Sequence, residues 1–160
     1  MLQLITLPNP ILRQRVTEVP LPPSQKIIDL IPQMFSAMEN YQGIGLAANQ
    51  INKSISLMVI ATSKGPRAFI NPRILKRSWS KDQIEEGCLS IPGVFGQVRR
   101  STRIYVSHLT DQGKVEKVWY EGMMARVYQH EVDHLNGVLF IDQAKIITQG
   151  QELLKQYERT

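Results

Sequence analysis

Cysteine and histidine are scarce in this chain. Its 160 residues include one cysteine, Cys88, and three histidines. A lone cysteine cannot form an intramolecular disulfide, so we expect no disulfide partner and a reducing compartment such as the cytoplasm. The thiol is therefore available to bind a metal ion or to take part in chemistry.

Long apolar runs are missing as well. No stretch of about 18 apolar residues occurs, so the sequence predicts no membrane span. The N-terminal residues lack a basic region followed by an apolar one, which predicts no signal peptide. Repeats, linkers and low-complexity segments are also absent, and the length suits a single domain over residues 1–160.

Negative charge is sparse in the middle of the chain. Of the 19 Lys/Arg and 14 Asp/Glu residues, nine and three lie in residues 64–103, which leaves ten and eleven elsewhere. This segment therefore holds the whole positive excess. A basic face favours RNA or another acidic surface, although a solvated surface of no special function is the more usual explanation. We expect Glu86, one of the three carboxylates, either to pair with a cation such as Arg126 or to face solvent.

Short segments with strand composition alternate with turn sequences. The predicted strands cover residues 55–60, 67–70, 73–80, 84–89, 103–109 and 115–120. The sequences SKGP and TDQG each separate two of them and predict antiparallel hairpins. We expect an α+β fold in which short antiparallel strands and hairpins pack around a central helix, with a further helix near the N-terminus.

The N-terminal helix is predicted from apolar residues at helical spacing over residues 24–42. Proline is tolerated in a first turn but breaks a hydrogen bond in a helix interior, so we expect the helix to begin near Asp29, which places Pro32 in the first turn. Gly43 is expected to end it. Residues 144–160 are predicted to form a last helix.

The central helix is predicted over residues 121–135 and contains the sequence QHEVDH. Positions i and i+4 lie on one helix face, so His130 and His134 can bind the same ion. Glu131 is rotated by about 100° and lies near the ion, where a carboxylate can act as a base. The HExxH pattern is typical of such metal centres; two surface histidines on an amphipathic helix are the alternative.

Two histidines do not complete a catalytic site, which takes three protein ligands and leaves one position open. A histidine six residues after the second is missing, since position 140 is Phe140. His108 lies in a predicted strand, and we expect it on the surface. Cys88 is the best remaining candidate, because Gly87 permits close backbone approach and a Pro-Gly pair predicts a loop just after it. A small buried hydrophobic residue is the alternative for this cysteine.

Three segments, taken in chain order, resemble the motifs of the peptide deformylase family. They are GIGLAANQ (43–50), EGCLS (86–90) and QHEVDH (129–134). The resemblance spans residues 2 to about 142 and implies a hydrolase that removes formyl from the N-terminal formyl-methionine of nascent peptides in the cytoplasm. It also implies one divalent ion, with Fe2+ as the usual native ion and Zn2+, Ni2+ or Co2+ as substitutes.

The resemblance also implies roles for individual residues. The metal ligands would be Cys88, His130 and His134. The catalytic groups would be the Glu131 carboxylate as general acid and base, the Gln50 side-chain amide and the Leu89 backbone N–H as oxyanion donors. The substrate-binding residues would be Ile44, Gly45, Gly87, Met123 and Val127. Met123 can equally be part of the core, since methionine fills irregular gaps.

Two other functions stay open at this stage. A zincin-type metallopeptidase shares HExxH but needs neither Cys88 nor Gln50. A metal-stabilised RNA-binding module would use residues 64–103 on RNA and a closed site with four protein ligands, of which the sequence offers three. The deformylase is favoured over both. A basic face is compatible with an enzyme that works at the ribosome.

Overall fold

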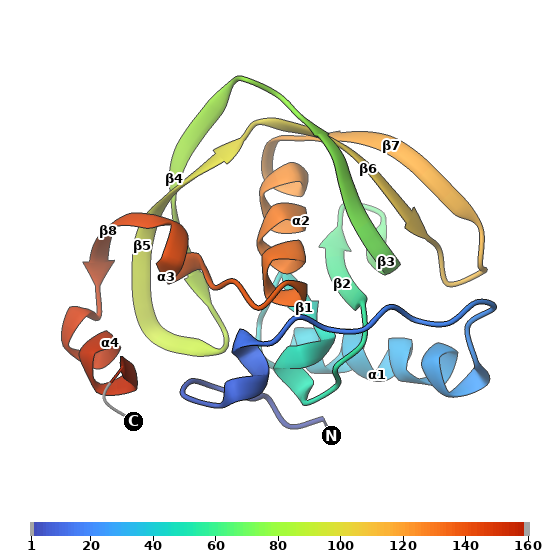
Figure 1. Cartoon of the computed structure of the whole chain (residues 1–160), viewed down its shortest axis with the longest axis horizontal. Coiled ribbons are helices and arrows are strands. Elements are labelled where there is room, and N and C mark those ends of the chain that lie inside the picture. Colours follow the sequence, from blue (N-terminus) through green and yellow to red (C-terminus); the bar gives the residue numbers. More distant parts are fainter. Residues whose placement is uncertain (1, 159–160) are drawn as a thin grey trace.

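The computed structural model describes residues 2–158, which form two sheets around a central helix (Figure 1). That helix is α2 (Gly122–Leu135), and α1 (Gln25–Asn40) lies below it in this view. Neighbouring strands within each sheet are antiparallel. The predicted α+β fold is therefore confirmed. Among the described residues, no helix is long and apolar enough to cross a membrane.

The larger sheet has five strands in the order β1-β2-β3-β6-β7. Their bounds are β1 (Gly45–Ala47), β2 (Leu57–Thr62), β3 (Gly65–Arg77), β6 (Arg103–Leu109) and β7 (Val115–Glu121). The two predicted hairpins are confirmed as β2–β3 and β6–β7. The predicted strand 67–70 and residues 73–77 of the predicted strand 73–80 instead belong to the single strand β3, whereas residues 78–80 lie outside it. Asn71 adopts φ 49°, and the register shifts between Ile70 and Arg73, so the strand continues past Asn71-Pro72 and keeps its pairing with β6.

The smaller sheet has the order β4-β5-β8. Its strands are β4 (Lys81–Cys88), β5 (Ile91–Ser101) and β8 (Ala144–Gln149). β5 was not predicted, because its Pro-Gly start favours a loop. The predicted last helix is wrong over residues 144–149, which pair with the free edge of β5, and only α4 (Gln151–Glu158) is helical. Short helices complete the chain: η1 (Pro10–Arg13), η2 (Ala48–Ile51) and α3 (Phe140–Gln143).

The predicted start of the N-terminal helix near Asp29 is wrong, since α1 begins at Gln25 and holds Pro32 in its interior. The proline lies on the exposed face, where water can satisfy the carbonyl that loses its partner. The extra first turn packs Ile27 and Ile28 against the core around α1, and this packing outweighs one lost hydrogen bond.

The predicted end of α1 at Gly43 is also wrong. The left-handed residue after the helix is Gln42, at φ 57°, and the Gly43 N–H then donates to the Met38 carbonyl at 2.9 Å. This is the hydrogen bonding of a helix end closed by one left-handed residue, a position that glycine usually fills.

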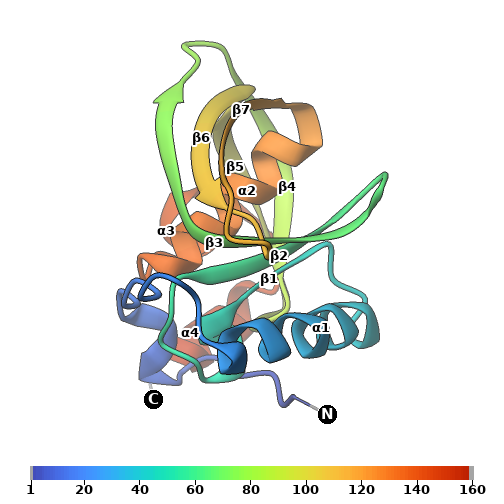
Figure 2. The same ribbon diagram turned by 90° about the vertical axis from the view of Figure 1, so that its right-hand side faces the viewer.

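Strand β2 is buried on both faces and separates two cores. Leu57 and Val59 pack toward α1, whereas Met58 and Ile60 pack toward α2. Figure 2, turned by 90°, shows α1 beneath β1 and β2 with α2 above them. The sheet thus holds α2 by one face, and the opposite face of α2 is turned toward β4 and β5.

Candidate active site

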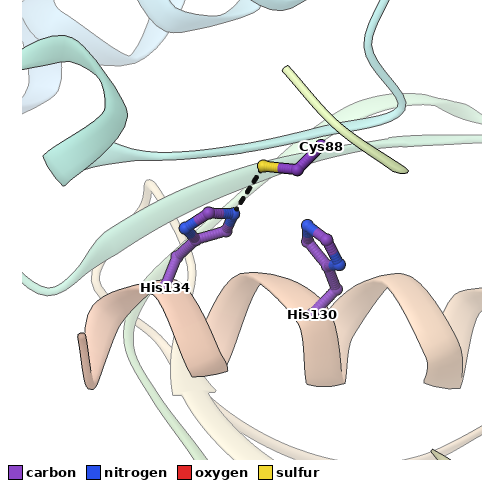
Figure 3. Close-up of side chains that lie close together, drawn as sticks. All are labelled: Cys88, His130 and His134. Atoms are coloured by element: carbon purple, nitrogen blue, oxygen red, sulfur yellow. Dashed lines mark hydrogen bonds between the residues drawn. The ribbon is translucent and has the colours of Figure 1, made fainter. Parts of the chain in front are cut away.

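The three predicted metal ligands converge between β4 and α2. Cys88 ends β4, while His130 and His134 lie one turn apart on α2 with their rings toward the thiol (Figure 3). Their ligand atoms all lie within 4.8 Å of one another, and Cys88 Sγ is 3.1 Å from His134 Nε2. An ion with bonds of about 2.0–2.3 Å keeps its ligand atoms roughly 3–4 Å apart, so the arrangement fits one tetrahedral ion. A thiolate with two imidazoles suits zinc or ferrous iron.

Gly87 permits the approach that brings Cys88 to α2. A Cβ at position 87 would lie 2.7 Å from a ring carbon of Phe95, its partner on β5. The β4–β5 register shifts between Gly87 and Cys88, which turns the thiol out of the sheet. The close approach expected at this glycine therefore exists, and it is made to a side chain of the neighbouring strand.

Glu86 orients His130 from the side away from the thiol. Its buried carboxylate accepts a hydrogen bond from His130 Nδ1 at 3.0 Å, two from Arg100 at 2.6 and 2.9 Å, and one from Arg126 at 2.6 Å. Burial by itself raises the pKa of Glu86, but the bonds from His130 and Arg100 outweigh it and lower the pKa to about 2. The expected pairing with Arg126 is confirmed. A carboxylate on one ring nitrogen directs the other, Nε2, toward the metal centre.

The two histidines have opposite protonation preferences. Burial opposes protonation of His130, yet hydrogen bonds with Cys88 and Glu86 raise its pKa to about 10. For His134, burial lowers the pKa well below its usual range. Because a metal ion binds the neutral form of an imidazole, ion binding at this site displaces the proton from His130.

Glu131 is 4% exposed and lies directly against Gly45. Its Oε1 would be 2.4 Å from a Cβ at position 45, so only glycine leaves room for this carboxylate. Among the described residues, Oε2 has no hydrogen-bond partner. Burial raises the pKa of Glu131 to about 7. A carboxyl group with a pKa near neutrality is suited to proton transfer in either direction.

Gln50 and Leu89 lie on the other side of the thiol. Gln50 is 2% exposed, and its Oε1 accepts a hydrogen bond from the Ala47 N–H at 2.8 Å. Its Nε2 therefore points the opposite way, to Ser90 Oγ at 3.1 Å and Cys88 Sγ at 3.6 Å. Leu89 follows Cys88 directly and lines the same cavity as Gln50.

A cavity of about 590 Å³ opens beside these groups. Its walls include the five predicted substrate-binding residues, namely Ile44, Gly45, Gly87, Met123 and Val127. Ile44 and Met123 are 58% and 59% exposed, so they form an apolar mouth, and the core alternative for Met123 is wrong. Val127 is 7% exposed and is shared between the cavity wall and the core.

Sequence reasoning missed two residues that hold the site in place. Asn49 Nδ2 donates to the His134 carbonyl at 2.6 Å and ties η2 to α2. Arg100 joins Glu86 to Asp133 of α2, the latter at 2.7 Å. Both are distant from α2 along the chain. Asn49 lies inside the motif GIGLAANQ, which is a sequence clue to its role. No sequence feature distinguishes Arg100 from the basic residues around it.

The prediction that His108 lies on the surface is wrong. It is 1% exposed, packs edge-on against Phe69 with ring centroids 4.7 Å apart, and contacts Glu116 Oε2 at 3.2 Å. The alternation of β6 directs position 108 toward α2, where Tyr128 lies against it. His108 is not part of the metal centre.

Comparisons with known proteins agree with this geometry. A family model described as "Polypeptide deformylase" matches residues 1–150. A peptide deformylase of Halothermothrix orenii is 40% identical over 158 residues, covering 96% of this chain and 98% of its own. The crystal structure of peptide deformylase from Thermotoga maritima matches with a TM-score of 0.88 and 39% identity over 91% of this chain and 99% of that one. A Met-Ala-Ser-bound peptide deformylase from Acinetobacter baumannii matches with a TM-score of 0.84 and 32% identity, over 89% and 98% of the two chains.

Proposed function

The chain belongs to the polypeptide deformylase family, and from this premise we propose how its residues carry out the reaction. The protein is a metal-dependent hydrolase that removes the N-formyl group from formyl-methionine at the start of nascent peptides and releases formate. The observation that carries the proposed roles is the convergence of Cys88, His130 and His134 beside the buried carboxylate of Glu131.

Cys88, His130 and His134 hold the ion in this proposal. A divalent ion with three protein ligands lowers the pKa of water toward about 7 and supplies a nucleophile at neutral pH. Glu86 supports the set by fixing His130 through the bond to Nδ1, and Arg100 with Arg126 keeps Glu86 ionised. The thiolate contributes one negative charge, so the centre keeps a net charge of about +1.

Gln50 and Leu89 are proposed to stabilise the oxyanion that forms from the formyl oxygen. The Gln50 amide is preorganised, because the Ala47 N–H fixes its oxygen and leaves its nitrogen aimed past Cys88. The Leu89 backbone N–H lies next to the thiol in sequence. Preorganised donors act strongly at a site closed to water, because they need no reorganisation as charge develops.

Glu131 is proposed to move the proton. Its carboxylate takes a proton from the attacking water and delivers it to the leaving amine, which becomes the new N-terminus. Burial raises its pKa to about 7, so the same group can accept and then donate near neutral pH. Gly45 keeps it in position by leaving space for Oε1.

The cavity is proposed to bind the methionine side chain and the start of the peptide. Its apolar mouth, formed by Ile44 and Met123, suits a methionine side chain, while Gly45 and Gly87 line the cavity beside it. The Met-Ala-Ser complex of the Acinetobacter baumannii relative supports a product peptide of this kind.

We propose that Fe2+ is the ion in the cell, that residues 1–160 act as one catalytic domain, and that the protein works in the cytoplasm. The site supports a single domain, because β1, β4 and α2 all contribute to it. Action on nascent chains supports the compartment, and it also supports attachment to the ribosome through a basic face.

The test is formate release from formyl-Met-Ala-Ser by protein purified without air and loaded with Fe2+ or Ni2+. Glu131→Gln is measured beside it, with Glu39→Gln, an exposed residue of α1, as the matched control. Rapid release that is lost only in Glu131→Gln supports the proposed roles. Protein that holds one ion per chain yet releases no formate would contradict them, and cleavage within an unformylated peptide would then point to a metallopeptidase.

A further inference from the structure

The outer face of β3, β6 and β7 combines aromatic and basic side chains. On β6, burial alternates, so Ile104 and Val106 face α2 while Arg103 and Tyr105 face outward. The outward residues that make up this aromatic–basic face are Lys76, Arg103, Tyr105, Lys117 and Trp119. We propose that the aromatic–basic face binds single-stranded RNA.

The centre of the face is a pair of rings. Tyr105 and Trp119 are direct partners across β6 and β7, with ring centroids 5.3 Å apart and planes tilted by 34°. The Arg103 guanidinium lies 5.1 Å from the Trp119 ring centroid. Trp119 is still 46% exposed, so this stack is open on its outer side. Aromatic rings displayed on a sheet bind unpaired bases by stacking, whatever the base sequence.

Lysines flank the ring pair on both sides. Lys76 is the β3 partner of Tyr105, and Lys117 lies two residues from Trp119 on the same side of β7. Both are exposed, and within residues 2–158 neither forms a salt bridge. Glu121, whose carboxylate faces outward at the end of β7, lies 3.5 Å from Arg103 and so already has a cationic partner. The uncompensated charge is therefore positive, as a phosphate backbone requires.

A third aromatic residue adjoins this face. Trp79, in the turn between β3 and β4, is 97% exposed. The preceding residue, Ser78, donates its N–H to the Arg103 carbonyl at 2.9 Å, which places Trp79 at the Arg103 end of the sheet. An indole that contacts almost nothing in its own chain contributes little to folding, but it extends the row of rings available to a flexible strand.

The charge pattern distinguishes RNA from a protein partner. Protein interfaces are depleted in lysine, whereas lysines border both sides of these rings. Some basic residues of the segment 64–103 are not free to bind RNA, because Arg100 is buried against Glu86 and Arg77 donates a hydrogen bond to Gln129. Of the remaining basic residues in this segment, Lys76 and Arg103 lie beside the rings. The face lies across the sheet from α2, so bound RNA leaves the catalytic cavity open.

The inference rests on the proposed action at the ribosome for its setting, but RNA binding is measured independently of deformylation. The probe is a fluorescein-labelled oligouridylate of about twelve nucleotides, which matches a typical single-strand site. Its anisotropy is titrated with the metal-loaded protein at several salt concentrations. Binding that weakens as salt rises is expected.

Paired variants locate the binding. Trp119→Ala is expected to weaken binding by about fivefold or more, the effect of losing one stacked base, whereas Trp119→Phe keeps a ring and most of the affinity. Lys76→Gln with Lys117→Gln is expected to reduce the salt slope by about 1–2. Lys26→Gln with Lys53→Gln removes the same charge from exposed positions far from the face and should leave the slope unchanged.

Several outcomes overturn the inference: no binding at low salt, equal weakening by the two lysine pairs, or equal competition by duplex RNA, which offers no unstacked bases. Sedimentation that shows a dimer dissociated by Trp119→Ala, without RNA binding, would assign the face to a second copy of the chain. Formate release is followed in the same preparations. Loss of that activity with RNA binding intact would contradict the proposed function but not the inference that this face binds RNA.

Discussion

Gly45 lies so close to the Glu131 carboxylate that any larger residue at position 45 would clash with it. A Cβ at position 45 would lie 2.4 Å from Oε1 and within 2.9 Å of two further atoms of the Glu131 side chain. Backbone of β1 thus forms one wall of the pocket that holds the proposed proton carrier. The side chain is also 4% exposed, so it has little room to move aside.

Gly45→Ala is therefore expected to displace Glu131 and to slow formate release by about 10²–10⁴-fold, the usual contribution of a positioned acid or base. The ion should remain bound, because Gly45 is not one of the three ligands. Single-turnover kinetics and metal analysis of the purified variant measure the two effects. In a Glu131→Gln background, adding Gly45→Ala should slow formate release little further. An equal further loss in that background would show that Gly45 acts by another route.

Cys88→Ser is expected to weaken ion binding by more than about 100-fold, since losing an outer partner alone costs about 10–100-fold. Serine keeps the size of the side chain but does not offer a thiolate to the ion. Competition with a chelator measures the affinity. Ser63→Ala, in the exposed β2–β3 turn, serves as the control. Undiminished binding in Cys88→Ser would mean that another residue is the third ligand.

Much of the site follows from the sequence, because a helix fixes the relative positions of His130 and His134. The predicted helix 121–135 differs from α2 by one residue. The β6–β7 hairpin was predictable for a similar reason, since a local turn sets its register. Features determined by residues close in sequence were therefore found.

What the sequence did not predict depends on partners far along the chain. β8 is a strand only because β5 offers a free edge, and its own residues equally permit a helix. His108 is buried because the inward face of β6 meets Tyr128 of α2. Arg100 looks like one of several basic residues until Glu86 and Asp133 close around it. Each of these depends on tertiary packing, which outweighs local preference.

Removing Arg100 tests how much the buried ion network stabilises the fold. Its side chain is 5% exposed and bonds both Glu86 and Asp133. Arg100→Met leaves buried carboxylates with fewer partners, so we expect the free energy of unfolding to fall by roughly 3–5 kcal/mol. Arg73→Met, whose exposed pair with Glu18 is expected to contribute only about 0–1 kcal/mol, is the matched control. Urea unfolding with chelator present compares the two, and similar losses would contradict the expectation.

Gln50→Leu separates an oxyanion donor from a structural residue. Losing one such donor typically slows the reaction by about 10²–10³-fold, so kcat should fall that far with the ion still bound. Ser90→Ala removes the other partner of the Gln50 nitrogen, 3.1 Å away, and should have a much smaller effect. Steady-state kinetics and metal content are measured for both. A purely structural Gln50 would instead show lost ion and lower thermal stability.

His108 is expected to make folding stability depend on pH. Burial lowers its pKa below the usual value of 6.5, and Arg67 adds to this, whereas Glu116 opposes both. Phe69, Tyr120 and Tyr128 also pack around it. Between the lowered pKa and 6.5, the unfolded chain binds more protons than the folded one, so the free energy of unfolding decreases as pH falls through this window. Above the window the histidine is neutral in both states and contributes no slope.

His108→Gln keeps a polar contact for Glu116 but cannot titrate. Its stability should therefore fall less steeply than that of the original chain as pH drops below 6.5, with the two profiles parallel above neutrality. Urea unfolding across this range, with chelator present so that ion release does not contribute, measures the difference between the profiles. Groups that do not interact with His108, including the other two histidines, are common to both proteins and cancel in that difference. Profiles that stay parallel into acid would show that His108 takes up its proton equally well in the folded and unfolded states.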